Sequence, residues 1–446
     1  MKTVVIFVDS KSRDLMGDAL IAHHLEKRGV RCILEPLASW RACVGAWKPD
    51  FILFNHLNSA HLAQFSQQLN KCGILTGILL NEGIFYIEGT LEYNSQVHYK
   101  NMHCDLYLSW NVTHLKELIK NKVCASESQI VAVGVPRFDF YKEPWNKVKR
   151  SARTTSGRPV ILMNSNFSIA HFHELPDEDG DRLFGQWKDK VPIYGDYRNA
   201  IIASHKGQSE FPQFIEALIA EDKYEIIVRP HPREESRFYL NWYEQLPSHQ
   251  QKHVRLAMKE EICDLILSCD LEISCENCTT TLEAWLAGKP SVGLTFEKHP
   301  FFYTPEIGSM QPECDQPSAL PELVKQALAD PDQPEFQDTR KQHIEKWVFK
   351  ADGQSSARTA ESIIHALDNT ASTKKIKLSF SNKRRGIKLR LLSALNEPSN
   401  TQPKHFFKHL IFGKLGKPTI RYKDYLKAIR PSDVRNARES IKKIDP

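Results

Sequence analysis

Two stretches of the sequence carry side chains that could bind an anionic ligand. The first runs from Glu225 to Pro232, where an apolar segment ends in Arg-Pro-His-Pro. Each proline fixes its own φ and favours extended backbone in the residue before it, so the pattern predicts a buried parallel strand that ends in a rigid turn. Ligands of open α/β sheets bind at the carboxyl ends of the strands. Arg229, His231 and Pro232 are therefore candidate ligand-binding residues.

The second stretch follows a predicted short strand at Leu271–Ile273 and is rich in hydroxyl groups. A helix is expected to begin near Thr281 and to end at residues 287–290, which read Ala-Gly-Lys-Pro. N–H groups and hydroxyls at a helix start can bind a phosphate, although ordinary capping also explains a threonine there. We expect both stretches to form a nucleotide monophosphate or diphosphate site, the second contributing Ser274, Thr279, Thr280 and Thr281. For Cys275 and Cys278, structural thiols are favoured over redox or zinc chemistry.

A possible catalytic carboxylate follows an earlier predicted strand, Ile74–Leu80. The sequence there is Asn81-Glu82-Gly83. A glycine removes side-chain bulk, so the neighbouring carboxylate could approach a substrate closely. Glu82 is thus a candidate general base or nucleophile, and a solvated or helix-starting acid is the equally open alternative. Arg137 follows another strand and either reaches toward a cleft between domains or pairs with Asp139.

Alternating apolar and amphipathic segments position these residues. The first set of predicted strands is Val4–Val8, Arg31–Glu35, Phe51–Phe54, Ile74–Leu80, Leu106–Trp110 and Ile130–Val133. After a polar linker at residues 147–159, a second set begins with a strand at 160–163 and continues with helices at 211–220, 234–245 and 260–268 and a strand at 291–296. Residues 171–195 are expected to form a loop or insertion. The alternation predicts parallel, doubly wound sheets, and no Gly-x-Gly-x-x-Gly motif indicates a dinucleotide cofactor.

Length and charge divide the chain into a body and a tail. The 446 residues suffice for two domains and a tail, and the net charge is +6. Residues 374–446 contain 20 Lys and Arg against 5 Asp and Glu, so residues 1–373 carry 6 − 15 = −9. Apolar residues between lysines at 405–414 suit a helix on an anionic membrane surface, with a solvated or partner-bound tail as the alternative. Nucleic acid is not expected as a partner.

The sequence also indicates a compartment. The first apolar run, Val4–Val8, is too short for a secretory signal, and no segment approaches the roughly 18 apolar residues of a membrane span. The ten cysteines are scattered, which favours reduced thiols. We expect a cytoplasmic protein, peripheral on the inner membrane if the tail binds lipid.

The order of these motifs resembles GT-B glycosyltransferases that use cytidine-nucleotide donors. Bacterial sialyltransferases and Kdo transferases carry an acidic motif with glycine, then a His-Pro motif, then a Ser/Thr motif. Residues 1–365 look most similar to a bacterial family of surface carbohydrate biosynthesis proteins. The motifs that carry this likeness are Arg13-Asp14-Leu15, Asn81-Glu82-Gly83, Gly134-Val135-Pro136-Arg137-Phe138-Asp139 and Arg229-Pro230-His231-Pro232.

The resemblance implies a role for each matching residue. Glu82 would be the catalytic carboxylate, and Asn81 stands where sialyltransferases often have an acid, which leaves inversion or retention open. His231 would act at the donor phosphate. Ser274 and the three threonines 279–281 would bind the phosphate or the sugar carboxylate, and Glu283 the ribose hydroxyls. The acceptor or cleft residues would be Arg13, Asp14, Asn81, Gly83 and Arg137.

The predicted fold class is α/β of the GT-B type, with two Rossmann-like parallel sheets and a cleft between them. The predicted parts are an acceptor domain at 1–150, a donor domain at 158–340, helices at 341–368 that pack back across the domains, and the basic tail at 374–446. The predicted activity is metal-independent transfer of a ulosonic acid such as Kdo from a CMP-sugar to a glycan or lipid-linked glycan, without a cofactor. The alternatives are a CDP-glycerol or CDP-ribitol polyol-phosphate transferase, a nucleotide-sugar 2-epimerase and a non-catalytic membrane adaptor.

Overall fold

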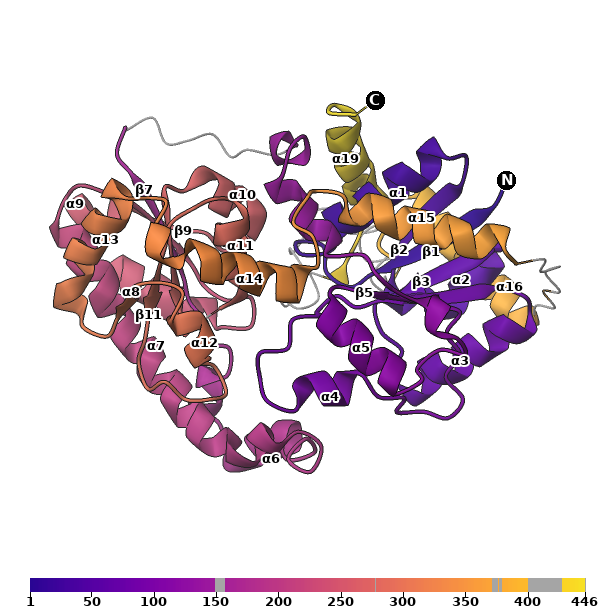
Figure 1. Cartoon of the computed structure of the whole chain (residues 1–446), viewed down its shortest axis with the longest axis horizontal. Coiled ribbons are helices and arrows are strands. Elements are labelled where there is room, and N and C mark those ends of the chain that lie inside the picture. Colours follow the sequence, from indigo (N-terminus) through magenta and orange to yellow (C-terminus); the bar gives the residue numbers. More distant parts are fainter. Residues whose placement is uncertain (149–156, 277, 371–375, 377–378, 400–426, 446) are drawn as a thin grey trace, which may run out of the picture. The chain divides into compact units, whose positions relative to one another are not determined.

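The structure, a computed structural model, describes residues 1–148, 157–276, 278–370, 376, 379–399 and 427–445. These residues form two compact units (Figure 1). The first unit contains Met1–Ile84, Ser95–Val148 and Lys346–Pro446. The second contains Phe85–Asn94 and Lys149–Glu345. Most of the linker predicted at 147–159 and the tail segment 405–414 lie outside the described residues.

The first unit is built on a six-stranded sheet in the order β2-β1-β3-β4-β5-β6. All of its neighbouring strands pair in parallel. The strands are β1 (Thr3–Val8), β2 (Arg31–Pro36), β3 (Phe51–Phe54), β4 (Leu75–Leu79), β5 (Leu106–Ser109) and β6 (Ile130–Ala132). The six strands predicted from apolar runs are confirmed to within two residues.

Helices from both ends of the chain complete the first unit. They are α1 (Leu15–Lys27), α2 (Trp40–Trp47), α3 (Ala60–Lys71), α5 (Val112–Lys120), α15 (Ser355–Asp368), α16 (Phe380–Ala394) and α19 (Pro431–Lys442). A hydrogen bond and an ion pair tie α1 to the residues after α19, because Asp445 lies 2.9 Å from His23 Nε2 and 2.6 Å from Lys27 Nζ. The described parts of the basic tail therefore pack on the first unit.

A buried carboxylate anchors α15. Asp139 accepts the backbone N–H groups of Ser355 at 2.9 Å and Ser356 at 2.7 Å, the first residues of that helix. An acid at a helix N-terminus satisfies N–H groups that have no partner within the helix and complements the helix dipole. Burial raises the pKa of Asp139 to about 6, although these hydrogen bonds oppose the shift.

The second unit contains another six-stranded parallel sheet, in the order β12-β11-β10-β7-β8-β9. Its strands are β7 (Val160–Asn164), β8 (Glu225–Arg229), β9 (Val254–Leu256), β10 (Leu271–Cys275), β11 (Ser291–Leu294) and β12 (Glu313–Cys314). Its helices are α4 (Thr90–Asn94), α6 (Asp177–Phe184), α7 (Tyr197–Ala220), α8 (Ser236–Gln245), α9 (Ser248–Gln251), α10 (Ile262–Ser268), α11 (Thr279–Leu286), α12 (Pro305–Gly308), α13 (Leu320–Ala329) and most of α14 (Gln337–Val348). The prediction of parallel, doubly wound sheets is confirmed.

Two predictions for the second unit are wrong. Residues 171–195 are not a continuous loop, because they contain helix α6. Asp177, Glu178 and Asp179 lie in its first turn, where their negative charge stabilises the positive end of the helix dipole. Helix α7 begins at Tyr197 rather than at residue 211. Its early turns bury Ala200, Ile201, Ser204, Gly207 and Gln208. Most of these residues are small or polar, so the sequence lacks the apolar periodicity from which a helix is predicted.

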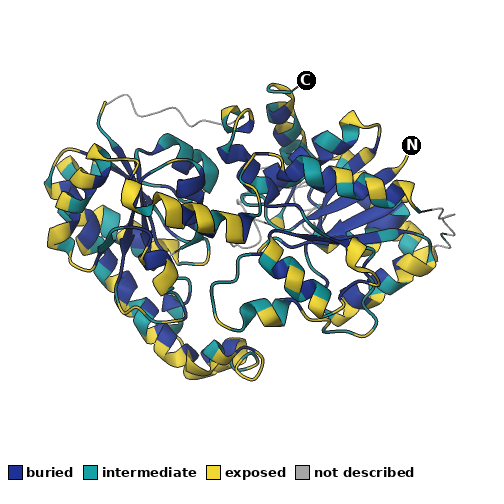
Figure 2. Cartoon of the chain, in the orientation of Figure 1, coloured by how far each residue is buried: buried dark blue, intermediate teal, exposed yellow. Residues whose placement is uncertain are grey.

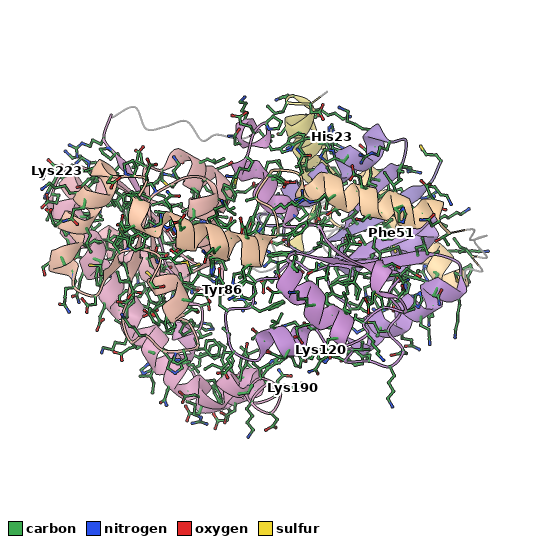
Figure 3. All side chains as sticks on the ribbon, in the orientation of Figure 1. His23, Phe51, Tyr86, Lys120, Lys190 and Lys223 are labelled. Atoms are coloured by element: carbon green, nitrogen blue, oxygen red, sulfur yellow. The ribbon has the colours of Figure 1, made fainter. Side chains whose placement is uncertain are left out.

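The central strands β1, β3, β7 and β10 are buried at every residue (Figure 2). Within the first sheet, Phe51 of β3 is fully buried (Figure 3). Its ring occupies the space beside Gly77 of β4, where an added Cβ would lie 2.4 Å from the Phe51 Cζ atom. In the second unit, the phenol of Tyr86 pairs with His343 Nε2 at 2.9 Å and so ties the segment after β4 to α14.

Helices α16 and α2 approach closely at two glycines. A Cβ on Gly386 would lie 2.4 Å from the carbonyl carbon of Gly45 and 2.7 Å from the backbone nitrogen of Ala46. Backbone atoms cannot move aside cheaply, so this crossing requires a glycine at residue 386.

We expect Gly386→Ala to lower the free energy of unfolding of the first unit by about 1–3 kcal/mol, because overpacking outweighs the gain in helix propensity. Chemical denaturation measures the change. Gly195→Ala is the matched control, since no atom lies within 4 Å of the Cβ added there. Equal stability of the two variants would contradict the expected close packing.

Candidate functional site

The carboxyl ends of three neighbouring strands bring predicted site residues together in the second unit. Asn164 of β7 lies in register with Arg229 of β8 on one side and with Ser274 of β10 on the other. The strand order reverses between β10 and β7, and ligands of doubly wound sheets bind at such a switch point. The two motifs found in the sequence therefore lie at one edge of one sheet.

The Arg-Pro-His-Pro turn favours one tautomer of the neutral His231 ring. The backbone N–H of Arg233 donates to His231 Nδ1 at 3.1 Å. A neutral imidazole that accepts at Nδ1 carries its proton on Nε2, so the ring has an N–H to donate. In this tautomer the half-buried ring carries a hydrogen-bond donor, Nε2–H.

Glu234 holds this turn in place and was missed by the sequence analysis. Its carboxylate accepts the hydroxyl of Ser165 at 2.8 Å, the backbone N–H of Phe167 at 2.8 Å and the backbone N–H of His231 at 3.2 Å. The phenol of Tyr239 also donates to it. Burial raises the pKa of Glu234, and these donors oppose the shift. The sequence feature that could have identified Glu234 is its position three residues after His231, where an acid is close enough to accept the N–H groups of the turn.

The hydroxyl stretch fastens α11 to the sheet. Ser274 and Thr281 pair through their hydroxyls, and the Thr280 hydroxyl donates to Glu272 Oε1 at 2.9 Å. Ser274, Thr280, Thr281 and Glu283 are at most 6% exposed, whereas Thr279 is half-buried. The helix begins at Thr279, two residues before the predicted start. The ligand-binding roles assigned to these side chains remain predictions.

Glu272 is a second buried carboxylate that the sequence analysis missed. It is fully buried in β10, and its Oε1 also accepts the amide of Asn164 at 2.8 Å. Its Oε2 has no hydrogen-bond partner among the described residues. Burial raises the pKa of Glu272 to about 7, despite the opposing bonds from Asn164 and Thr280. A carboxyl that is protonated below that pH fits this environment better than a charged one.

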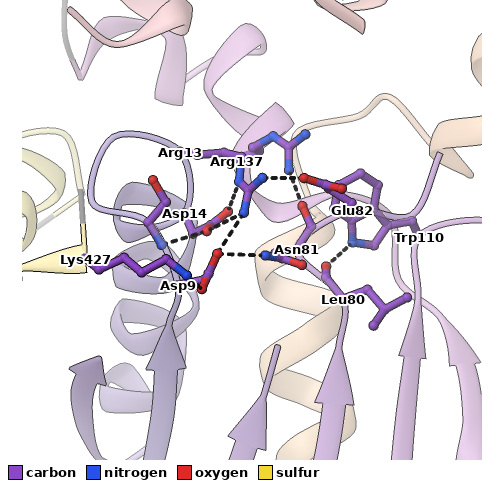
Figure 4. Close-up of polar contacts among 10 residues, drawn as sticks. Asp9, Arg13, Asp14, Leu80, Asn81, Glu82, Trp110, Arg137 and Lys427 are labelled. Atoms are coloured by element: carbon purple, nitrogen blue, oxygen red, sulfur yellow. Dashed lines mark hydrogen bonds and ion pairs between the residues drawn. The ribbon is translucent and has the colours of Figure 1, made fainter. Parts of the chain in front are cut away.

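In the first unit, Arg13 organises the predicted carboxylate site (Figure 4). Its guanidinium contacts Glu82 Oε1 at 2.6 Å, Asp14 Oδ1 at 3.0 Å and Asp9 Oδ2 at 3.3 Å. Burial disfavours the charged form of Arg13 and so lowers its pKa. The attraction of the three acids is larger than this effect, and the pKa of Arg13 is raised. The Glu82 side chain is 68% exposed, so the carboxylate is held by an ion pair yet open to solvent.

Arg137 contacts the same loop rather than pairing with Asp139. Its Nη1 donates to the carbonyl of Asn81 at 3.0 Å, and its guanidinium carbon lies 4.7 Å from the centre of the Trp110 ring. The alternative, an ion pair between Arg137 and Asp139, does not form, because the Asp139 carboxylate accepts the N–H groups at the start of α15. Close packing explains the glycine at residue 83, since an added Cβ would lie 2.6 Å from Cγ of Trp110.

A small cavity of about 40 Å³ lies beside this cluster in the first unit. Its polar lining includes Asp9, Asp14, Asp18, Asn55, Asn81 and Arg137. A volume of this size accommodates a water molecule or one hydroxyl group. In the described part of the chain, no group of three or more His, Cys, Asp or Glu residues could hold a metal ion.

Comparisons with known proteins identify the fold. No family model matches the sequence, and no curated protein matches it. Among solved structures, S. aureus MnaA in complex with UDP is 12% identical, with a TM-score of 0.50 over 85% of this chain and 100% of that chain. A putative UDP-N-acetylglucosamine 2-epimerase from Listeria monocytogenes is 12% identical, with a TM-score of 0.51 and the same coverage. The predicted two-domain α/β fold class of the GT-B type is confirmed.

The Glu272 carboxyl predicts a pH dependence of stability. Its folded pKa, about 7, lies above its ordinary 4.5, so its contribution to stability is full below about pH 4.5 and is lost as the pH rises through about 7. Glu272→Gln should therefore stabilise the protein more at about pH 8 than at about pH 5, by about 1–3 kcal/mol. Urea unfolding at both pH values measures this difference. The exposed Glu244→Gln is the control, and a pH-independent effect of Glu272→Gln would contradict the assignment.

Proposed function

We propose that the chain is a glycosyltransferase of cell-surface polysaccharide biosynthesis, which transfers a ulosonic acid such as Kdo from a CMP-sugar to a glycan or lipid-linked glycan. The observation that supports it most is the His231 turn, in which Nδ1 accepts a backbone N–H and Nε2 therefore carries the proton. This N–H donor lies at the carboxyl edge of a parallel sheet, where nucleotides bind in this class of fold.

The donor half of the reaction follows from that geometry. When the bond between the anomeric carbon and the phosphate oxygen breaks, the electron pair stays on the departing CMP. His231 would donate Nε2–H to a phosphate oxygen, and the first N–H groups of α11 would favour the same negative charge. These donors can stabilise the leaving group without a metal ion, and we propose metal independence on this basis.

In the acceptor half of the proposed reaction, Glu82 would act as the general base. Its carboxylate would take the proton of the acceptor hydroxyl as that oxygen attacks the sugar. Arg13 fixes the carboxylate through Oε1 at 2.6 Å, and Arg137 holds the loop through the carbonyl of Asn81. Asp14 in turn positions Arg13.

A second candidate function is a nucleotide-sugar 2-epimerase. The observation that favours it is the pair of fold neighbours, one of them solved with UDP and the other described as a putative UDP-N-acetylglucosamine 2-epimerase. An epimerase would convert its sugar nucleotide without any acceptor, so product analysis distinguishes the two functions. A polyol-phosphate transferase would instead consume CDP-glycerol or CDP-ribitol.

The decisive experiment incubates the purified full chain with CMP-Kdo, CMP-sialic acid, CDP-glycerol and UDP-N-acetylglucosamine, each with and without a glycan acceptor. Release of CMP from CMP-Kdo, faster with acceptor, is the expected result. Conversion of the UDP-sugar alone would establish the epimerase instead. Turnover of no donor, together with an unchanged membrane role for variants of Glu82 and His231, would favour the non-catalytic adaptor.

Two substitutions of His231 separate its nitrogen atoms. His231→Asn keeps an acceptor for the Arg233 N–H but has no donor at the Nε2 position, whereas His231→Gln places an amide N–H near that position. We expect His231→Asn to lower the rate of donor cleavage about 10²–10³-fold and His231→Gln to lower it less. Steady-state kinetics measure both, and equal losses would argue against donation from Nε2.

Glu82→Gln should lower the rate of transfer about 10²–10⁴-fold, because the amide can still accept from Arg13 but cannot take a proton. Calorimetric binding of CMP should be unchanged. Glu88→Gln, an exposed acid in the same loop, is the matched control. Full transfer activity in Glu82→Gln would exclude this carboxylate as the base.

A further inference from the structure

Helix α16 is fixed on the first unit by one face. Leu389 and Leu392 are buried, Gly386 lies against Gly45, and Arg390 Nε donates to the carbonyl of Ala46 at 2.7 Å. A helix held by close backbone packing and a hydrogen bond has a defined orientation. Its outward face is therefore a fixed feature of the fold.

That outward face carries an apolar stripe. Phe380, Ile387, Leu391 and Leu395 are 83%, 61%, 59% and 56% exposed. Phe380 and Ile387 are two helical turns apart, with Arg384 at the position between them, and Leu391 and Leu395 follow at steps of four residues. All four apolar side chains therefore share one side of the helix. Of the eleven exposed large hydrophobic residues in the described part of the chain, these four fall within 16 consecutive positions. Such a concentration marks an interaction surface rather than scattered exposure.

The same helix is strongly basic. It contains Lys383, Arg384, Arg385, Lys388 and Arg390 and no acidic residue. All five side chains belong to exposed residues. Residues 1–373, in contrast, have a net charge of −9 by the count given above. An anionic surface would therefore attract this helix and repel most of the remaining chain, which orients the protein.

We propose that α16 lies on an anionic lipid bilayer, with Phe380, Ile387, Leu391 and Leu395 in the boundary between headgroups and acyl chains and with Lys383, Arg384, Arg385 and Lys388 at the lipid phosphates. Basic helices with an apolar stripe bind membrane surfaces in this way. None of the described helices has the length and apolar character needed to cross a bilayer. This inference does not depend on the proposed transferase activity.

Charge and chemistry favour lipid over the other occupants. Residues 400–426 contain six Lys and Arg and one Asp, so that segment carries the same sign of charge as α16. A second copy of α16 would repel the first for the same reason. Nucleic acid would use the basic residues but would leave the aliphatic stripe exposed.

Co-sedimentation of the full chain with lipid vesicles tests the proposal. The chain should bind vesicles of phosphatidylcholine mixed with phosphatidylglycerol, and should bind pure phosphatidylcholine at least about tenfold more weakly. Ile387→Ser with Leu391→Ser should weaken binding to the anionic vesicles at least about tenfold, because less apolar surface enters the bilayer. The control, Leu175→Ser with Leu240→Ser, removes two other exposed leucines, 42% and 43% exposed, and should leave binding unchanged.

A charge variant tests the other half of the surface. Lys383→Gln, Arg384→Gln and Lys388→Gln together should weaken binding at least about tenfold and reduce its dependence on salt. The control changes the exposed Lys252, Lys259 and Lys341 to Gln. Failure of the unmodified chain to bind anionic vesicles would overturn the proposal.

Binding that survives in the stripe variant would also overturn it, as would a dimer in sedimentation that the stripe variant abolishes. The stripe residues are exposed, so thermal unfolding of these variants should match that of the unmodified chain. Cleavage of a water-soluble donor should be unchanged in them, which keeps this test separate from that of the transferase.

Discussion

Parallel pairing is the constraint on which the rest of this molecule depends. Because every strand in each sheet points the same way, all carboxyl ends in that sheet open at one edge. Polar side chains from distant parts of the sequence then meet at that edge. In the second unit Asn164, Arg229 and Ser274 share one register, and in the first unit the loops after β1 and β4 meet through Arg13 and Glu82.

Buried carboxylates fix the loops that emerge from these edges. Glu234 joins the exit of β7 to the His231 turn, Glu272 joins β10 to β7 and α11, and Asp139 holds the start of α15. Burial raises the pKa of each of these acids, so each one depends on the donors that surround it. The N–H or hydroxyl donors come from loops, which explains how short, irregular segments obtain a definite geometry.

The sheets could be predicted because runs such as Val4–Val8 and Phe51–Phe54 are apolar over a strand length and are separated by amphipathic segments. Residue type and position were enough to propose Glu82 and His231 as candidate site residues, and their catalytic roles remain predictions. The full role of Glu234 and Glu272 could not be predicted, since their partners lie up to 69 and 108 residues away and an isolated glutamate suggests a solvated charge. The hydroxyls of Ser274 and Thr281 likewise suggested ligand contacts, whereas in this structure they bond to each other.

The contacts between α1 and Asp445 have a consequence for synthesis on the ribosome. Asp445 contacts His23 and Lys27 across 422 and 418 positions of the sequence, so the helical layer of the first unit stays incomplete until α19 and Asp445 have been synthesised. The second sheet, in contrast, lies entirely between residues 160 and 314 and can assemble earlier. Helix α1 is therefore made long before its contact at Asp445, and the strands of the second sheet are synthesised in the interval.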